Sequence, residues 1–260
     1  MKGDPHEEQI LRSWQVNASP WSRAIRSASI ASRELVTNAA IMDAMAYVAA
    51  DFGAAKSGAD KSGAAKFSAA NMGGASSGPL RVLDVGCGEG WLARALGAQG
   101  MRVTGIDAVP ALVAAAHKSG GGDFQVLDYA AIAARQWRAG PFDVAVCNFS
   151  LLGADSVDSL IAGLRAYVAN PGFLVVQTLH PVAACGDAPY QDGWRPGNWC
   201  GFSSDFSDPA PWFFRTIESW QALLKSNGFE LLECREPTAA LATAPSSIIW
   251  ICKARATAQT

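Results

Sequence analysis

Three glycines alternate with other residues between Asp84 and Gly90, where the sequence reads D-V-G-C-G-E-G. The segment follows a short apolar run that predicts a strand, and it precedes an apolar stretch from Trp91 that predicts a helix. Because glycine carries no side chain, the backbone can approach a ligand closely, and N–H groups at the helix start can donate hydrogen bonds to an anionic group. The pattern therefore predicts a ligand-binding loop at the carboxyl end of the first strand. The residues expected around the ligand are Asp84, Gly86, Cys87, Gly88 and Gly90.

Two kinds of ligand use a glycine loop of this type in Rossmann-like sheets. The dinucleotide loop has the spacing G-x-G-x-x-G/A, and its third position is occupied here by Trp91. An indole there would obstruct a pyrophosphate lying against the helix. The pattern D-x-G-x-G-x-G, with Asp84 at the strand end, instead resembles the first motif of the class I S-adenosylmethionine-dependent methyltransferases. An NAD(P)-dependent oxidoreductase stays an alternative, as does a non-catalytic partner subunit that kept the cofactor loop.

An aspartate also ends the second predicted strand. Asp107 lies directly after the run from Met101 to Ile106 and is followed by Ala108. A carboxylate there can accept hydrogen bonds from both hydroxyls of a ribose, so we place Asp107 and Ala108 in the cofactor site. Asp107 could also cap the helix expected to begin at Pro110, and both roles can hold together.

Two further segments acquire a role from the methyltransferase resemblance. Asp128 and Tyr129 follow the third predicted strand, where the resemblance implies contact with the adenine; Asp128 could otherwise cap the helix expected near Ala130. Asn148 follows the fourth strand, in a segment that lies beneath the sulfonium and the acceptor in this family. It could contact the methionine part of the cofactor, or only satisfy backbone at the strand end. The sequence lacks the D/N-P-P-Y pattern of methyltransferases that modify nucleic-acid amino groups.

His180 is the candidate general base. It ends the fifth predicted strand, on the side where ligands bind, and the ordinary histidine pKa near 6.5 suits proton transfer at neutral pH. The alternative is a histidine that caps or bridges loop backbone. Methyl transfer from a sulfonium needs mainly orientation and a dry site, so the chemistry requires no further catalytic side chain.

Aromatic residues that could bind an acceptor gather in the N-terminal helices and in the connection from 181 to 215. The connection from 181 to 215 has no clear periodicity, and long connections of this kind often carry function. Aromatic rings offer an apolar face to a planar acceptor, although they could equally form a small core under the loop. The expected substrate contacts are Trp14, Trp21, Tyr190, Trp194 and Trp212.

Composition divides the chain into three regions. Residues 1–52 predict amphipathic helices that form a lid over the cofactor cleft, and one of their arginines could bind a carboxylate of cofactor or substrate. Residues 53–78 are nearly all Ala, Gly, Ser and Lys, and predict a flexible insertion. Residues 79–257 form the expected methyltransferase domain. The lid arginines are Arg23, Arg26 and Arg33, and the alternative is that they lie on solvated helix faces.

From Pro79 onward, predicted strands and helices alternate, which favours a mostly parallel sheet covered on both faces. The last two strands, 231–234 and 248–252, have no helix between them and predict an antiparallel hairpin at one edge. The fold prediction is a doubly wound, Rossmann-like α/β sheet of seven strands, mostly parallel with one reversed C-terminal strand, plus an N-terminal helical cover.

Bulk properties set limits on the partners. The formal net charge of -2 gives no strong field toward nucleic acid or an acidic membrane, and the longest apolar stretch, 144–154, is too short to span a bilayer. The six cysteines form no C-x-x-C pair, so we expect reduced core residues and no metal site. Acids at the start of the chain argue against a targeting peptide, and we expect a cytoplasmic protein acting on a small-molecule acceptor. The acceptor, the methylated atom and the oligomeric state stay open.

Overall fold

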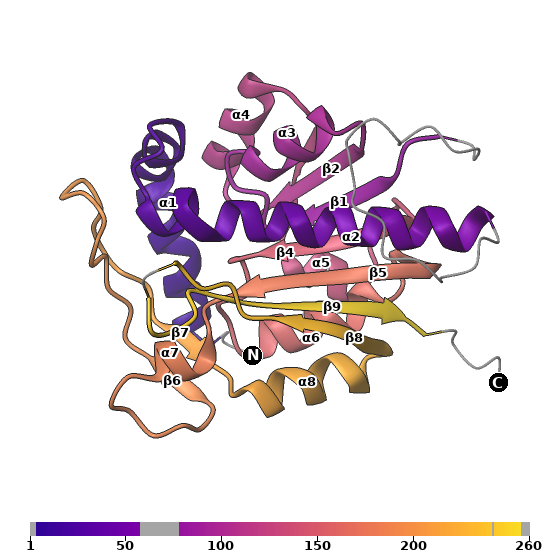
Figure 1. Ribbon diagram of the computed structural model, residues 1–260. Helices are drawn as coiled ribbons and strands as arrows, with labels where there is room; N and C mark the ends of the chain where they lie inside the picture. Colours follow the sequence, from indigo (N-terminus) through magenta and orange to yellow (C-terminus); the bar gives the residue numbers. More distant parts are fainter. Residues whose placement is uncertain (1–3, 58–77, 241, 256–260) are drawn as a thin grey trace.

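A seven-stranded sheet forms the centre of the computed structural model, which describes residues 4–57, 78–240 and 242–255 (Figure 1). The strand order is β3-β2-β1-β4-β5-β9-β8. Neighbouring strands from β3 to β5 pair in parallel, whereas β9 is antiparallel to both β5 and β8. The predicted sheet of seven strands with one reversed strand is therefore confirmed. Its strands are β1 (Arg81–Val85), β2 (Arg102–Asp107), β3 (Asp123–Val126), β4 (Phe142–Asn148), β5 (Val168–Thr178), β8 (Phe229–Arg235) and β9 (Ile248–Ala254).

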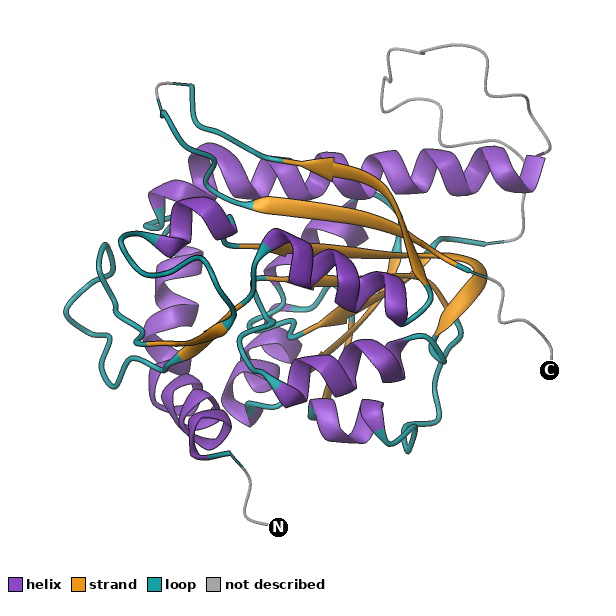
Figure 2. Ribbon diagram, turned by 90° about the horizontal axis from the view of Figure 1, so that it is seen from below, coloured by secondary structure: helices purple, strands orange, loops and turns teal. Residues whose placement is uncertain are grey.

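Helices cover both faces of this sheet, as Figure 2 shows. Side chains alternate between the two faces of the sheet, so that neighbouring residues of one strand join different cores. Val82 joins the core on the face covered by the first layer of helices, and Leu83 joins the core on the opposite face, covered by the second layer. Strand β9 is apolar on both sides because both of its faces are buried. The first layer holds α2 (Asn38–Ser57), α3 (Trp91–Ala98) and α4 (Pro110–Ser119), and the second holds α5 (Tyr129–Ala133), α6 (Asp155–Leu164) and α8 (Ile217–Ser226).

The N-terminal helices occupy two different places. Helix α1 (Pro5–Arg26) packs against α4 at the edge where the parallel strands end, while a π-helical turn, η1 (Arg33–Thr37), leads into α2 on the sheet face. By length and composition alone, the stretch Arg33–Gly53 could cross a membrane, but its Ile41, Met45 and Val48 are fully buried in the sheet core. Most of the predicted insertion at 53–78 lies outside the described residues, and the division into a lid, an insertion and a catalytic domain stays a prediction.

The connection between β5 and α8 contains regular structure that periodicity did not predict. It holds a short helix, α7 (Pro181–Cys185), and a two-stranded antiparallel sheet of β6 (Gly193–Arg195) and β7 (Trp212–Phe214). Conversely, the helix expected near Ala130 is short and ends at Ala133. The chain turns at Arg135, which has a φ of 54°, and Trp137 then stacks on Phe142 instead of extending the helix.

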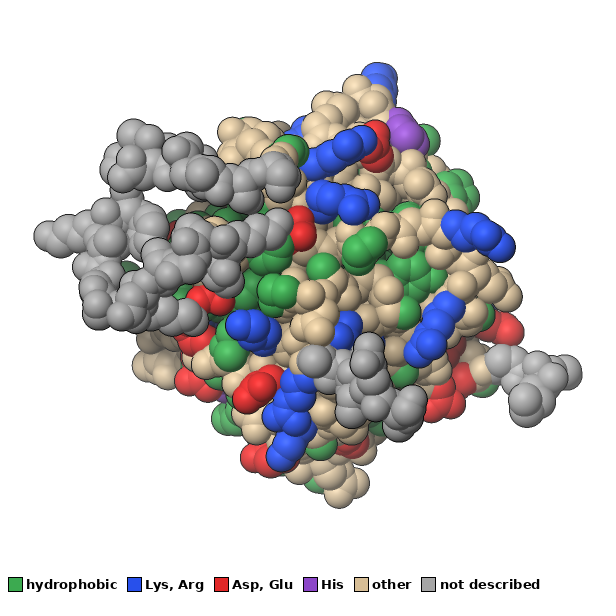
Figure 3. Space-filling model, turned by 90° about the vertical axis from the view of Figure 1, so that its right-hand side faces the viewer, with side chains coloured by type: hydrophobic (Ala, Val, Ile, Leu, Met, Phe, Trp, Pro, Cys, Tyr) green, Lys and Arg blue, Asp and Glu red, His purple; other side chains and the backbone are tan. Residues whose placement is uncertain are grey.

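Charged side chains of both signs are interspersed on the side of the molecule where the parallel strands begin (Figure 3). The described part of that face shows no broad area in which all charged side chains have the same sign. The carboxyl ends of the strands lie at the other side, next to α1, and this is where the functional site is formed (Figure 1).

Candidate active site

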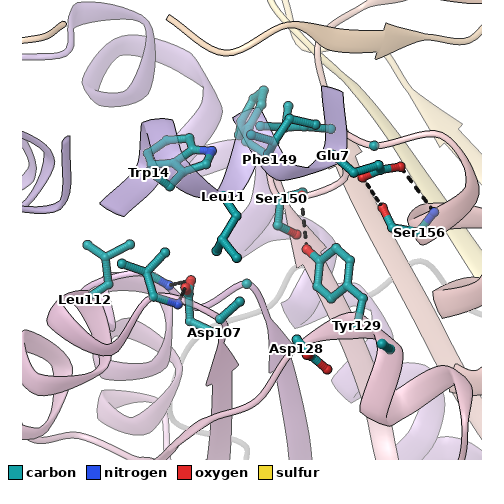
Figure 4. A pocket seen from close by; sticks show the side chains of 18 of the residues that line it. Glu7, Leu11, Trp14, Asp107, Leu112, Asp128, Tyr129, Phe149, Ser150 and Ser156 are labelled. Atoms are coloured by element: carbon teal, nitrogen blue, oxygen red, sulfur yellow. Dashed lines mark hydrogen bonds between the residues drawn. The ribbon is translucent and has the colours of Figure 1, made fainter. Parts of the chain in front are cut away.

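A cavity of about 310 Å³ lies between the carboxyl ends of the strands and helix α1 (Figure 4). Its floor comes from the segments that follow β1, β2, β3 and β4. The sequence-predicted residues on this floor are Gly86, Gly88, Asp107, Ala108, Asp128, Tyr129 and Asn148. Seven of the ten predicted cofactor residues thus line one cavity, as expected where the carboxyl ends of parallel strands meet.

Helix α1 forms the roof of the cavity with one stripe of side chains. The stripe has the i, i+3, i+4, i+7 spacing of a single helix face, and Leu11 points into the cavity (Figure 4). The helix starts at a capping Asp4 followed by Pro5, and the fully buried Asn17 exchanges two hydrogen bonds with the backbone of Ser207. The roof residues are Glu7, Ile10, Leu11, Trp14 and Trp21.

The glycine loop is held tightly to β2 and leaves only backbone facing the ligand. The N–H groups of Gly86 and Cys87 both donate to the carbonyl of Ile106. Gly86 has a φ of 74°, and a Cβ at this position would collide with the Cβ of Ser150. A Cβ on Gly88 would lie 3.6 Å from Nε1 of Trp21. The loop therefore needs glycine both for its conformation and for the space above it.

Asp107 fixes this loop to the start of α4. Its Oδ2 accepts the Gly88 N–H at 2.9 Å, and its Oδ1 accepts the Val109 N–H at 2.8 Å. Burial raises the pKa of the Asp107 carboxyl, and the two N–H donors oppose that shift. Each oxygen keeps a lone pair that can accept a hydrogen bond from a ribose hydroxyl. Asp107 can therefore both bind a ribose and cap α4, the two roles expected from sequence.

A second, smaller cavity of about 50 Å³ adjoins the first and shares Gly86, Gly88, Trp21 and Asn148 with it. Asp84 lies here, 2% exposed, and its Oδ2 has no hydrogen-bond partner among the described residues. The Oδ1 of Asn148 is buried and unpartnered in the same way. Burying two oxygen acceptors without hydrogen-bond donors lowers the stability of the fold, unless a ligand supplies the donors.

Burial raises the pKa of Asp84 to about 7. The neighbouring Asp107 adds to this rise, and Arg33 opposes it. The carboxyl is therefore close to half ionised at neutral pH before any ligand binds.

Arg33 faces Asp84 from the N-terminal region. It begins the π-helical turn η1, a rare local structure that is often found at functional sites. Its guanidinium lies 4.9 Å from the ring centre of Trp91 and 5.6 Å from that of Trp21, and burial lowers its pKa. Within the described chain it makes no hydrogen bond or ion pair. Of the three lid arginines named from sequence, this one is buried beside the cofactor loop.

Asp128 and Tyr129 sit at the start of α5. Asp128 caps that helix by accepting the Ala131 N–H at 2.8 Å, and it lines the cavity as well. The Tyr129 hydroxyl donates to the Ser150 carbonyl at 2.9 Å, and its ring lines the cavity (Figure 4). Burial raises the pKa of Tyr129.

Several predicted residues lie away from the main cavity. Cys87 lines the smaller one, and Gly90 lines neither; a Cβ on Gly90 would collide with Phe124. Of the aromatic candidates, Trp14 and Trp21 line the main cavity, but the three from the 181–215 connection do not. The Tyr190 hydroxyl accepts the Ile217 N–H, Trp194 stacks on His6, and Trp212 packs on Phe214.

His180 does not reach the cavity either. Its Nδ1 accepts the Ala183 N–H at 3.4 Å, capping α7, and its Nε2 lies 3.1 Å from Oε1 of Glu236. Both ring nitrogens are therefore engaged within the 5% exposed side chain. This is the capping arrangement that sequence analysis kept as the alternative to a general base.

We expect His180→Ala to lower the free energy of unfolding by about 1–2 kcal/mol, because the cap and the contact with Glu236 are both lost. Affinity for S-adenosylhomocysteine should stay unchanged. Urea denaturation and calorimetry measure the two quantities. A selective loss of turnover with unchanged stability would instead support the role as base.

Sequence reasoning missed Glu7, Ile10, Leu11 and Ser156, which also line the cavity. The helical spacing from Glu7 to Trp14 was the available signal. Only the fold shows that this stripe faces the glycine loop and not solvent, because the two segments lie about seventy residues apart.

Residues 44–234 match the family of proteins described as the methyltransferase domain. The chain belongs to this family. Its cofactor is S-adenosylmethionine, as the glycine loop indicated. Among curated proteins, a ubiquinone biosynthesis O-methyltransferase from Rickettsia canadensis is 25% identical over 162 residues, which make up 60% of this chain and 65% of that protein. The match thus covers less than two thirds of the length of these curated relatives.

Two solved structures share the fold over nearly the whole chain. The magnesium protoporphyrin IX methyltransferase of Synechocystis, which has S-adenosylhomocysteine bound, superposes with a TM-score of 0.58 at 15% identity, over 96% of this chain and 100% of that one. The 1,6-didemethyltoxoflavin-N1-methyltransferase of Burkholderia thailandensis gives a TM-score of 0.56 at 16% identity. That superposition covers 98% of this chain and 92% of the Burkholderia protein. At these identities the likeness establishes the fold.

Proposed function

We propose that this protein transfers a methyl group from S-adenosylmethionine to O, N or C of a small aromatic or amphiphilic acceptor. The observation that carries the proposal is the pair of adjoining cavities. The larger has Asp107 and Asp128 where a nucleoside would lie. The smaller has the unpartnered oxygens of Asp84 and Asn148, together with the buried guanidinium of Arg33.

These groups fit the two charged ends of an amino acid. The oxygens of Asp84 and Asn148 can accept hydrogen bonds from an ammonium, and the guanidinium of Arg33 can bind a carboxylate. A nucleoside joined to an amino acid matches both cavities, whereas a nicotinamide dinucleotide has no ammonium for the smaller one. The family membership favours the same ligand over the oxidoreductase alternative.

When bound, the cofactor supplies an activated methyl group on a positively charged sulfur. The protein's own task is then to orient the acceptor and exclude water. Helix α1 covers the cavity with Leu11, Trp14 and Trp21, and these apolar side chains support an acceptor with an aromatic or aliphatic body.

Calorimetric titration tests the proposed binding mode of the cofactor. We expect S-adenosylhomocysteine to bind and NADH not to bind. Arg33→Gln should weaken S-adenosylhomocysteine by about 10- to 100-fold, since a buried guanidinium–carboxylate interaction is lost. Adenosine, which lacks the amino acid end, should bind wild type and Arg33→Gln equally. Binding of NADH alone, or a loss of adenosine affinity in Arg33→Gln, would contradict the proposal.

Catalysis itself is tested by screening acceptors with a methyl-labelled donor. Label in a small-molecule product separates an enzyme from a non-catalytic partner subunit. Such a subunit would bind S-adenosylhomocysteine normally but label no acceptor.

A further inference from the structure

The charges on the main cavity have one sign. Three carboxylates line it, those of Glu7, Asp107 and Asp128, and among its described lining residues there is no Lys, Arg or His. Asp107 ends β2 and Asp128 follows β3, and both lie on the floor in the positions assigned to the cofactor. Glu7 is the charged member of the roof stripe, and an acceptor between cofactor and roof must lie near that stripe.

Glu7 is held firmly in place by residues far along the chain. Its Oε1 accepts the Ala154 N–H at 2.8 Å. The same oxygen accepts the Ser156 N–H at 3.3 Å, and Oε2 accepts the Ser156 hydroxyl at 2.7 Å (Figure 4). Oε2 keeps a lone pair that can accept a hydrogen bond from a ligand. Three donors fix the carboxylate position, and no described Lys, Arg or His side chain forms an ion pair with it.

Through the same contacts, the Glu7 carboxylate occupies the positive N-terminal end of helix α6. Ala154 is its N-cap residue and offers no capping side chain, so Glu7 satisfies the free N–H groups there. A helix N-terminus is a natural site for a ligand anion, but this one is already occupied by a protein carboxylate. An acceptor carboxylate or phosphate would meet Glu7 there instead of the helix end.

The nearby arginines do not compensate. Arg12 pairs with Asp208 at 3.4 Å and Arg23 pairs with Asp205 at 2.9 Å, both on exposed parts of α1. The buried Arg215 donates to the carbonyls of Gly153 and Ala154 and pairs with Asp158 at 2.6 Å, and it does not line the cavity. Arg33 lies in the smaller cavity, where the proposed function assigns it to the cofactor. The acceptor space is therefore left with apolar walls and one carboxylate.

Resting on the proposed function, we infer that the acceptor is a neutral or cationic compound with a planar or apolar body and a hydrogen-bond donor directed at Glu7. The body packs against Ile10, Leu11 and Trp14 of the roof. Anionic acceptors are rejected because their charge would lie beside a carboxylate in a partly desolvated site. Glu7 is thus a specificity-determining residue of the acceptor site.

Three phenols that differ only in the charge of their side arm test this inference: tyramine is cationic, tyrosol is neutral and 4-hydroxyphenylacetate is anionic. Their dissociation constants are measured by ligand-observed NMR on protein saturated with S-adenosylhomocysteine. We expect tyramine and tyrosol to bind at least about tenfold more tightly than 4-hydroxyphenylacetate. Glu7→Gln should reduce this ratio to about twofold or less, while Glu8→Gln, on an exposed neighbour in the same helix, should preserve it.

Equal affinities for the three phenols, or tightest binding of 4-hydroxyphenylacetate, would overturn the inference. So would a charge preference that survives unchanged in Glu7→Gln. The saturation step reports separately on the cofactor, because a protein that fails to bind S-adenosylhomocysteine contradicts the proposed function whatever the order of the phenols. Thermal unfolding of both variants with bound S-adenosylhomocysteine verifies that the roof helix remains folded.

Discussion

Replacing Gly86 with alanine is expected to abolish measurable binding of S-adenosylhomocysteine, a loss of at least about a hundredfold, and to destabilise the protein by about 2–4 kcal/mol. Gly86 combines a left-handed backbone with a neighbour in the space a Cβ would need. That neighbour, Ser150, cannot move freely, since its hydroxyl donates to the Val85 carbonyl at 2.7 Å and it follows Phe149, whose φ is 55°. The clash should therefore displace the loop on which the cofactor rests.

Gly100→Ala is the matched control for this experiment. Gly100 has a φ of 85°, similar to that of Gly86, but nothing lies within 4 Å of a Cβ built there. It should lose only about 1 kcal/mol from backbone strain and bind the cofactor normally. Ser150→Gly in the Gly86→Ala background removes the colliding atoms and should recover part of the stability. Equal behaviour of Gly86→Ala and Gly100→Ala, in urea denaturation and in calorimetry, would disprove the steric argument.

The affinity for S-adenosylhomocysteine is expected to rise with pH and then level off above about pH 7. Burial gives Asp84 a pKa of about 7, so below that pH the carboxyl is protonated, and binding an ammonium requires it to lose the proton. Well below pH 7 each pH unit should weaken binding about tenfold, and the loss between pH 7 and pH 5 should be roughly fiftyfold, about 2.3 kcal/mol. Calorimetry in buffers of different ionisation enthalpy also detects the released proton.

The control for this prediction separates Asp84 from the other carboxylates. Asp84→Asn should bind more weakly at pH 8 and lose most of the pH dependence, whereas Asp128→Asn should keep the dependence, because Asp128 is exposed. Asp107, whose pKa burial also raises, can contribute a smaller remaining slope. A wild-type affinity that is flat from pH 5 to pH 8 would remove Asp84 from the ammonium site.

The same carboxyl sets a pH dependence of stability in the free protein. The folded pKa of about 7 lies above the ordinary value of 3.8, so the folded chain holds more protons between these values. The stabilisation from the neutral form is complete below about pH 4 and is lost as the pH rises toward 7. Asp84→Asn should therefore gain stability relative to wild type as the pH increases over this range.

The sequence predicted the sheet well because its strands are short apolar runs separated by clear helix signals. The run from Arg81 to Val85 and the glycine loop after it are local patterns, and the loop's place at a strand end follows from the topology of parallel sheets. The floor of the active site could thus be predicted from residues that directly follow strands.

The roof and the 181–215 connection could not be predicted in the same way. Their positions depend on contacts between distant segments, such as Glu7 with Ser156 and Asn17 with Ser207. A histidine at a strand end, such as His180, has the right chemistry for a base, yet here its nitrogens are engaged by Ala183 and Glu236. Residue type and strand position do not show which neighbours a side chain will meet.

The place of β9 in the sheet also restricts how the chain can fold during synthesis. This last strand lies between β5 and β8, although both partners are made before it. Until residues 248–254 leave the ribosome, β5 exposes an unpaired edge and β8 has no strand to join, which leaves the nascent chain open to mispairing with other strands. Completion of the sheet must therefore wait until residues 248–254 have been synthesised, because β9 alone joins β8 to β5.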